Sequence, residues 1–187
     1  MAGSPTTRDR LIAAAAETFN RDTYHGTDTN RLARAAGFAP ATFYKHFPDK
    51  RAAFLAVYRE WVDAEWNALE DTLKEAVGDP RAIVDVVVDH HVRWAGLRAS
   101  LRVLVPVDEQ VREFARRQRR RQLDWLARLR GRRVPVSGRH HEPRDLALLL
   151  TFERVADAIA DGEAAALGVN PDDLRTQLAT TVRQWFA

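Results

Sequence analysis

The sequence of 187 residues contains no cysteine, and this absence excludes disulfide bridges and thiolate metal sites. No apolar run approaches the length of a membrane span. The first ten residues, MAGSPTTRDR, lack the apolar stretch of a secretory signal peptide. We therefore expect a cytoplasmic protein with no membrane partner, and its apolar content of 45% suffices for a sizeable core.

Segments with the alternating pattern of a β-strand are almost absent. Even the valine-rich stretch from Ile83, IVDVVVDHHV, has helical spacing, because its apolar positions recur every three or four residues. The residues at this spacing are Val84, Val87, Val88, His91 and Trp94. Prolines and glycines stand between the periodic stretches, as helix boundaries require. The sequence therefore predicts an all-α chain of about nine helices.

The expected organisation is an N-terminal helix-turn-helix head followed by a helical bundle. Helices are expected over about 7–20, 29–36, 40–47, 50–75, 80–99, 101–105, 108–130, 143–167 and 171–187. Thr6 and Asp9 have the spacing of a capping box, and Asp28 is a good N-cap for the second helix. We expect a DNA-binding domain over residues 1–50 and an effector-binding and dimerisation domain over residues 51–187, connected by the helix from about residue 50.

The net charge of +3 lies entirely in the N-terminal third. Residues 1–60 hold nine Lys/Arg and six Asp/Glu, whereas residues 61–187 hold twenty of each. A basic surplus confined to one module indicates an anionic partner, of which nucleic acid is the commonest.

The stretch GFAPATFYKHFPDK from Gly37 contains a helix too short to be stable in water unless its neighbours hold it. Phe43 and Phe47 stand four residues apart and share one face. Leu32, Ala33 and Ala36 of the preceding helix are expected to receive that face. The outward face then carries Ala41 and Lys45, with Thr42 and Tyr44 on its flanks. These groups suit a helix that enters the major groove, and the Gly37 turn makes the pair a helix-turn-helix.

Supporting contacts to the DNA backbone are expected beside this helix. Thr27 and Thr29 stand at the start of the second helix, where backbone amides bind phosphate well. Lys50 stands at the N-terminus of the fourth helix, where a cation is unfavourable for the helix dipole, and a phosphate neighbour would explain it. The full set of candidate DNA-contacting residues is Thr27, Thr29, Pro40, Ala41, Thr42, Tyr44, Lys45, His46 and Lys50.

The segments TRDRLIAAAAETF and YHGTDTNRLARAAGFAPATFYKHFPDKRAAFLAVY resemble the N-terminal domain of TetR/AcrR-type transcriptional regulators over about residues 7–60. The resemblance implies a homodimer, a palindromic double-stranded operator, and a C-terminal pocket for a small-molecule effector. It identifies Thr42, Tyr44 and Lys45 as groove and phosphate contacts, with Thr27 and Lys50 on the backbone. It implies no enzymatic activity, cofactor or metal.

Two positions depart from the family pattern. Ala39 stands where the family usually has Ser or Thr, and Ala as an N-cap costs on the order of 1 kcal/mol relative to Ser. Pro40 at the first helical position offsets part of this cost. Ala41 offers no hydrogen bond, so readout of DNA shape is expected to supplement direct readout of bases.

The C-terminal module has no comparably specific motif. Aromatic and polar residues on its helices are candidates for an effector cavity, with ordinary core packing as the alternative for each. The candidates are Trp61, Trp94, Phe114, Gln118, Trp125 and Phe152. The last two helices are apolar on several sides and would form a four-helix bundle with a second copy. The candidate interface residues are Leu149, Phe152, Ile159, Leu174, Leu178 and Trp185.

The function expected is a ligand-responsive transcriptional regulator, with repression by an operator-bound homodimer favoured. Whether the effector releases or promotes DNA binding stays open. One alternative is a non-specific helical DNA-binding protein. Another is a helical metalloenzyme that uses His90, His91, His140 and His141, although adjacent helical residues point about 100° apart and no Glu-x-x-His pair is present.

Overall fold

The computed structural model describes residues 4–75, 79–131 and 141–186, and these ranges hold ten helices and no strand. The all-α expectation is confirmed, and nine expected helices is close to this count. The chain divides into two compact units. Unit 1 consists of Met1–Ala64 and Trp94–Phe114, and unit 2 consists of Glu65–Arg93 and Ala115–Ala187. None of the helices in the described ranges is long and apolar enough to cross a bilayer.

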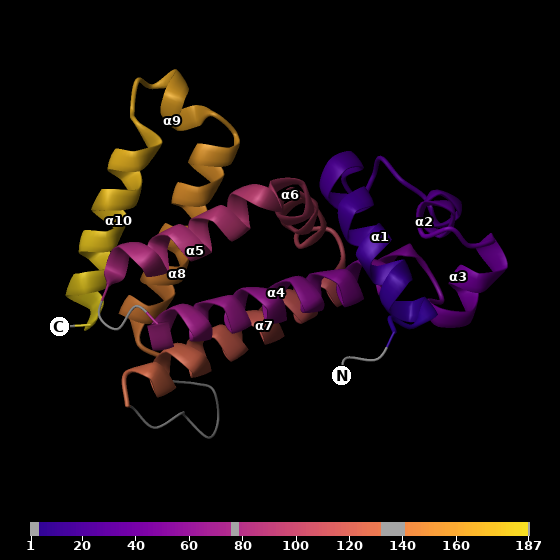
Figure 1. Ribbon diagram of the computed structural model, residues 1–187, viewed down its shortest axis with the longest axis horizontal. Coiled ribbons are helices and arrows are strands. Elements are labelled where there is room, and N and C mark those ends of the chain that lie inside the picture. Colours follow the sequence, from indigo (N-terminus) through magenta and orange to yellow (C-terminus); the bar gives the residue numbers. More distant parts are fainter. Residues whose placement is uncertain (1–3, 76–78, 132–140, 187) are drawn as a thin grey trace. The chain divides into compact units, whose positions relative to one another are not determined.

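Unit 1 contains the helix-turn-helix (Figure 1). Its helices are α1 (Thr7–Asp22), α2 (Thr29–Ala35), α3 (Pro40–His46), α6 (Ala95–Leu104) and the first part of α4 (Lys50–Glu75). The expected capping box is present, because the Asp9 amide donates to Thr6 Oγ1 and the Thr6 amide donates to Asp9 Oδ2. Phe19 of α1 packs edge-on against Phe54 of α4, with ring centroids 5.3 Å apart. This contact joins the first turns of α4 to α1, and the functional boundary expected at residue 50 stays a prediction.

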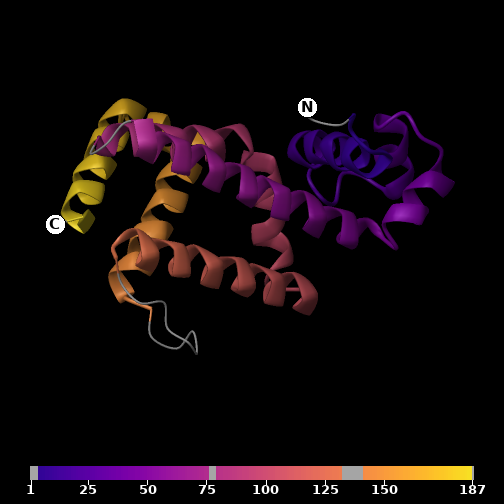
Figure 2. The ribbon, with the colours of Figure 1, turned by 60° about the horizontal axis from the view of Figure 1, so that its bottom comes forward.

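Unit 2 is a helical bundle in which α5 (Pro80–Arg93) packs against α8 (Pro143–Ala160) and α10 (Pro171–Phe186), as Figure 2 shows. The later parts of α4 and α7 (Glu109–Leu129) and the short α9 (Glu163–Ala166) complete it. One buried apolar cluster holds these helices together. Its members include Leu69, Val84, Val88, Phe152, Leu178 and Trp185.

Two of the expected helices are each broken into separate segments in the structure. The helix expected over 80–99 ends at Arg93, and Trp94 adopts φ −108° and ψ 29° before α6 begins. The single helix expected over 143–167 ends at Ala160, and the chain turns at Gly162 with φ +74° before α9. The second break has a local cause, because this left-handed conformation favours glycine. The first break lies at Trp94, two residues before Gly96.

Candidate DNA-reading face and effector cavity

Helix α2 is fixed at both ends. Asp28 accepts a hydrogen bond from the Arg31 amide and caps α2. At the other end, Gly37 adopts φ +78°, and the Phe38 amide donates to the Ala33 carbonyl. Arg10 of α1 then donates to the Ala36 carbonyl, and its guanidinium lies 4.5 Å from the centre of the Phe38 ring. The clamp by Arg10 is a feature that the sequence analysis missed.

Helix α3 is anchored as the sequence predicted. Phe43 and Phe47 are buried, with ring centroids 5.5 Å apart, and the three expected receiving residues on and after α2 are buried as well. The opposite side is open to solvent. Pro40, Ala41, Tyr44, Lys45 and His46 are exposed, and Thr42 is partly exposed. The cap at Ala39 makes no side-chain hydrogen bond, and Pro40 occupies the first helical turn, as expected.

Tyr44 is held in place on this outward face by a second residue. Its hydroxyl lies 2.9 Å from Thr29 Oγ1 at the start of α2. Two hydroxyl groups carry two protons, and a bond between them uses one. The pair therefore keeps one hydroxyl proton for a further acceptor while fixing the direction of the Tyr44 ring. Sequence analysis selected both residues but did not pair them.

The structure places Thr27 and Lys50 differently from the expectation of backbone contacts. Thr27 is 5% exposed, and its hydroxyl is buried with no hydrogen-bond partner among the described residues, so this group does not face a phosphate. Lys50 Nζ donates to the carbonyls of Tyr24 and Thr27, both at 2.9 Å, and lies 4.2 Å from the Tyr24 ring centre. Burial lowers the pKa of Lys50. The cation at this helix start is thus explained by partners within unit 1, and its contact with phosphate stays a prediction.

Helix α6 is capped by a side chain from α1 rather than by its own N-cap. Asn20 Oδ1 accepts hydrogen bonds from the amides of Gly96 and Leu97, at 3.1 and 3.2 Å. The Tyr24 amide donates to Ser100 Oγ one turn further along. Gly96 permits this approach, because a Cβ at that position would lie 1.9 Å from the Asn20 carbonyl oxygen. The first helix of the DNA-binding head and α6 are therefore joined by polar and steric contacts.

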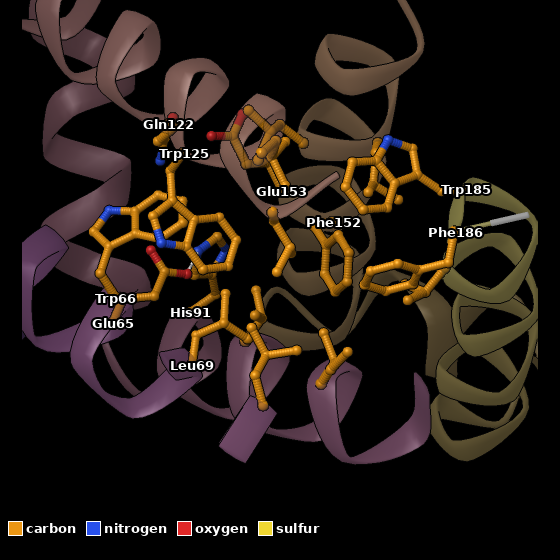
Figure 3. A pocket seen from close by; sticks show the side chains of 18 residues that line it. Glu65, Trp66, Leu69, His91, Gln122, Trp125, Phe152, Glu153, Trp185 and Phe186 are labelled. Carbon is orange, nitrogen blue, oxygen red and sulfur yellow. Dashed lines mark ion pairs between the residues drawn. The ribbon is translucent and has the colours of Figure 1, made fainter. Parts of the chain in front are cut away.

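Unit 2 contains a cavity, shown in Figure 3, that suits a small apolar molecule. Its empty space, including solvent at the mouth, is about 650 Å³. The wall is mostly apolar and comes from α4, α5, α7, α8 and α10. Residues that shape it include Trp66, Leu69, Trp125, Phe152, Trp185 and Phe186.

The structure brings two of the six predicted effector residues, Trp125 and Phe152, to this cavity. Trp61 and Phe114 instead pack around Tyr58 in unit 1, with ring centroids 5.0 and 6.1 Å from it. Trp94 is also in unit 1, where it precedes α6. Gln118 is buried and accepts a hydrogen bond from Arg121, but it does not line the cavity.

Polar residues of the cavity include a buried acid–base pair that the sequence analysis did not select. Glu65 and His91 are 4% and 5% exposed, and Glu65 Oε1 lies 2.6 Å from His91 Nε2. Glu153 also lines the wall and receives two hydrogen bonds from Arg119, at 2.7 and 2.8 Å. The signal for the first pair was available, because Glu65 interrupts an apolar stripe of α4 and His91 continues one in α5.

The predicted dimer residues divide between the core and the surface of unit 2. Phe152, Leu178 and Trp185 belong to its buried cluster, so they are not available as a surface in the separate chain. Leu149, Ile159 and Leu174 are partly buried. The exposed apolar residues of α8 are instead Leu146 and Leu150, which stand four residues apart. The assignment of Leu149, Ile159 and Leu174 to a dimer interface stays a prediction.

Polar contacts as well as apolar packing hold Trp185 in the core. Its Nε1 donates to Asp145 Oδ1 at 2.8 Å, and Arg130 lies 3.3 Å from the same oxygen. The Arg130 guanidinium also lies 4.9 Å from the centre of the Trp185 ring. Asp145 is 1% exposed, so this carboxylate fastens the end of α10 to the start of α8.

The four histidines of the metalloenzyme alternative have other surroundings where they are described. His91 pairs with Glu65, and His141 Nε2 lies 3.6 Å from Asp124 Oδ1. His140 lies outside the described residues. Within the described ranges, no group of three or more His, Cys, Asp or Glu side chains could hold a metal ion.

Comparison with known proteins agrees with the geometry of the head. Residues 11–57 match the family model of bacterial regulatory proteins of the tetR family. The fatty acid metabolism regulator protein of Bacillus subtilis is 25% identical over 87 residues, which are 46% of this chain and 45% of that protein. The chain thus spans less than half the length of this curated relative.

Solved structures share the fold over almost the whole chain. A protein from Rhodococcus sp., described as a TetR-family transcriptional regulator, has a TM-score of 0.73 at 16% identity, covering 97% of this chain and 98% of that one. A transcriptional regulator from Saccharomonospora viridis, solved in complex with choline, has a TM-score of 0.71 at 16% identity, covering 94% of each chain. Residues 11–57 are therefore similar to the helix-turn-helix head of bacterial regulatory proteins of the tetR family, and the whole chain shares the all-α fold of these solved regulators.

Proposed function

We propose that the protein is a ligand-responsive repressor that binds a palindromic operator as a homodimer and is released by a small apolar or amphipathic effector. The observation that carries the proposal is the two-sided character of α3. Phe43 and Phe47 bury one side, and the other side presents Tyr44 and Lys45 to solvent. Such a helix fits the major groove, with Lys45 and the Tyr44–Thr29 hydroxyl pair directed at phosphate oxygens or base edges.

A homodimer would supply the second reading helix. Leu146 and Leu150 form an exposed apolar pair on α8, and Leu150 is 50% exposed. Burying this pair against its copy about a two-fold axis gives a self-complementary interface. Two α3 helices spaced by one turn of DNA, about 34 Å, would then read the two halves of a palindrome.

Communication between effector and DNA would use the chain segments that join the units. Helix α4 continues from Ala64 into Glu65, and Glu65 lines the cavity. Helix α5, which carries His91, leads into α6, and α6 is capped by Asn20 of the head. An effector that binds better to a conformation with the wrong spacing of α3 would shift the population away from DNA.

The names and contents of similar proteins leave the effector's chemistry open. The Bacillus subtilis relative is named for fatty acid metabolism, whereas the Saccharomonospora viridis structure contains choline. Fatty acids are anions and choline is a cation. The choice for this chain therefore depends on its own cavity.

The experiment is a binding titration by fluorescence anisotropy against duplex DNA from the chain's own promoter and a shuffled duplex, over a series of salt concentrations. Lys45→Ala should weaken operator binding, and the slope of log K against log salt should fall by about 2, because a dimer loses two phosphate contacts of about 0.9 each. Tyr44→Ala should also weaken binding, while gel filtration shows an unchanged dimer. Lys74→Ala, at an exposed position of unit 2, is the matched control.

Unchanged affinity and salt slope for Lys45→Ala and Tyr44→Ala would remove α3 from the DNA interface. Equal affinity for the promoter and shuffled duplexes would favour the non-specific DNA-binding alternative.

A further inference from the structure

The two ends of the unit 2 cavity differ in chemistry. Figure 3 shows Glu65, His91, Trp66 and Trp125 at one end and Trp185 and Phe186 at the other. Leu69 and Phe152 lie along the wall and are apolar. A ligand that fits both ends has a polar group at the Glu65 end and an apolar body that extends toward Trp185.

The charge of the wall selects against an anion. Among the described residues, the lining contains two carboxylates, Glu65 and Glu153, one histidine, and no lysine or arginine. Arg119 offsets the charge of Glu153 through two hydrogen bonds. His91 can carry at most one positive charge, which would offset Glu65. The wall is therefore negative or neutral in either protonation state of His91, and no state gives an anionic head group a net positive partner.

Aromatic faces beside Glu65 add to the attraction for a cation. The Trp66 and Trp125 rings have centroids 4.7 Å apart and are inclined at 53°. Trp125 Nε1 lies 3.3 Å from Glu70 Oε1, and this contact holds its indole in position. Indole faces attract cations, and the attraction is strongest where water is excluded. A buried carboxylate between two helices and a pair of indoles at the same end of a cavity form a site for a positively charged nitrogen.

We propose that the effector is a hydrophobic organic cation, with its charged nitrogen beside Glu65, Trp66 and Trp125 and its apolar body against Leu69 and Phe152. That the ligand acts as an effector rests on the proposed function, whereas its positive charge is inferred from the residues of the cavity wall. The cation interacts with Glu65 and with the indole faces, and the apolar tail gains burial along the rest of the wall.

The test uses three probes with the same ten-carbon tail: decyltrimethylammonium, 1-decanol and decanoate. Each is titrated below its micelle concentration into the full chain without DNA, by isothermal calorimetry, with quenching of tryptophan fluorescence as a second readout. We expect the cation to bind at least about tenfold more tightly than decanoate, with 1-decanol between them. Decanoate binding as tightly as the cation, or no binding of the cation, overturns the proposal.

Variants separate the charge of Glu65 from the shape of the cavity. Glu65→Gln should weaken decyltrimethylammonium by about tenfold and leave 1-decanol within about twofold, which also shows that the variant folds and keeps its cavity. Glu75→Gln makes the same change at an exposed position of the same helix and should alter neither probe. Trp66→Leu should weaken the cation more than the alcohol. Unchanged binding of the cation by Glu65→Gln overturns the proposal.

Failure of this proposal can be distinguished from failure of the proposed function. The probe titrations contain no DNA, and the operator titrations contain no probe. A chain that binds its operator but prefers decanoate keeps the regulator and loses the cation. A chain that prefers decyltrimethylammonium but does not bind its promoter keeps the cation site and loses the operator.

Discussion

Substituting Gly96 by alanine should reverse the usual effect of this change in a helix. Replacement of glycine by alanine in a helix normally stabilises by roughly 0.5–1 kcal/mol, because alanine loses less backbone entropy on folding. Gly96 is the second residue of α6, and an added Cβ would lie 1.9 Å from the Asn20 carbonyl oxygen of α1. This contact involves backbone, so no side-chain rotation relieves it.

The magnitude follows from the distance that α1 and α6 must separate. A carbon in ordinary van der Waals contact needs about 3.5 Å, so the two helices must part by roughly 1.5 Å at this point. Overpacking of this kind costs about 1–3 kcal/mol. The separation also lengthens the two hydrogen bonds from Gly96 and Leu97 to Asn20, each contributing about 0.5–1.5 kcal/mol. We expect a net destabilisation of about 2–4 kcal/mol and, for a chain of this size, a fall in Tm of about 4–15 °C.

The assay is thermal unfolding followed by circular dichroism, with Ala99→Gly as the control in the same helix. Ala99→Gly carries the intrinsic cost of a helical glycine without a new contact, so it should lower stability by about 1 kcal/mol. Gly96→Ala should therefore melt below both the original chain and the control. A Gly96→Ala protein that melts at or above the temperature of the original chain would show that α1 and α6 do not approach as closely as the structure describes.

Two further substitutions test the capping of α2 and the buried carboxylate of unit 2. The hydrogen bond from the Arg31 amide holds the pKa of Asp28 below its ordinary 3.8. The Asp28 carboxylate therefore stabilises the fold fully above pH 3.8, and this stabilisation is lost as the pH falls through the lower pKa of the folded state. Asp28→Asn, an equally good cap, should match the original chain in urea titrations at pH 7 and lose less stability on acidification to about pH 2; an equal acid loss would contradict this. Asp145→Ala should lower the free energy of unfolding in urea titrations by about 3–5 kcal/mol, because it removes the buried partner of Arg130 and of the Trp185 indole. Trp185→Phe should cost about 1 kcal/mol from the lost hydrogen bond plus a packing loss. Similar values for both variants would place the carboxylate outside the core.

The head could be predicted from the sequence because its signals are local. Phe43 and Phe47 stand one turn apart, Asp28 caps α2 from the adjacent position, and Gly37 supplies the positive φ that the turn requires. Each of these relations lies within a few residues of the chain, so spacing alone determines it. The clamps by Arg10 and Lys50 bridge 26 residues each, and no local pattern indicates them.

The start of α6 shows the limit of local signals. Residues 80–99 have continuous helical spacing, and Gly96, two residues after Trp94, is an isolated glycine of the kind that a helix tolerates, so a single helix was the natural prediction. The break is stabilised by Asn20, which supplies the cap from 76 residues earlier in the chain. A helix boundary that depends on a tertiary cap leaves only a weak signal in its own segment, here Gly96, whereas Gly162 at the second break adopts the positive φ that favours glycine.

The cavity was harder to predict because aromatic residues suit both cores and cavities. Trp61 and Trp66 are five residues apart on α4, yet one packs in unit 1 and the other lines the cavity of unit 2. The unit in which each indole packs depends on its neighbours in the fold, and the spacing of residues along α4 does not indicate them.

The charged residues carry a clearer signal. Glu65 follows Val62 by three residues and precedes Leu69 by four, so it belongs to a buried stripe, and His91 follows Val87 by four in another. A buried acid and a buried base each require a partner, and pairing the two satisfies both. Interruptions of apolar stripes by single titratable residues therefore predict which helices meet, and here they also predict where the cavity becomes polar.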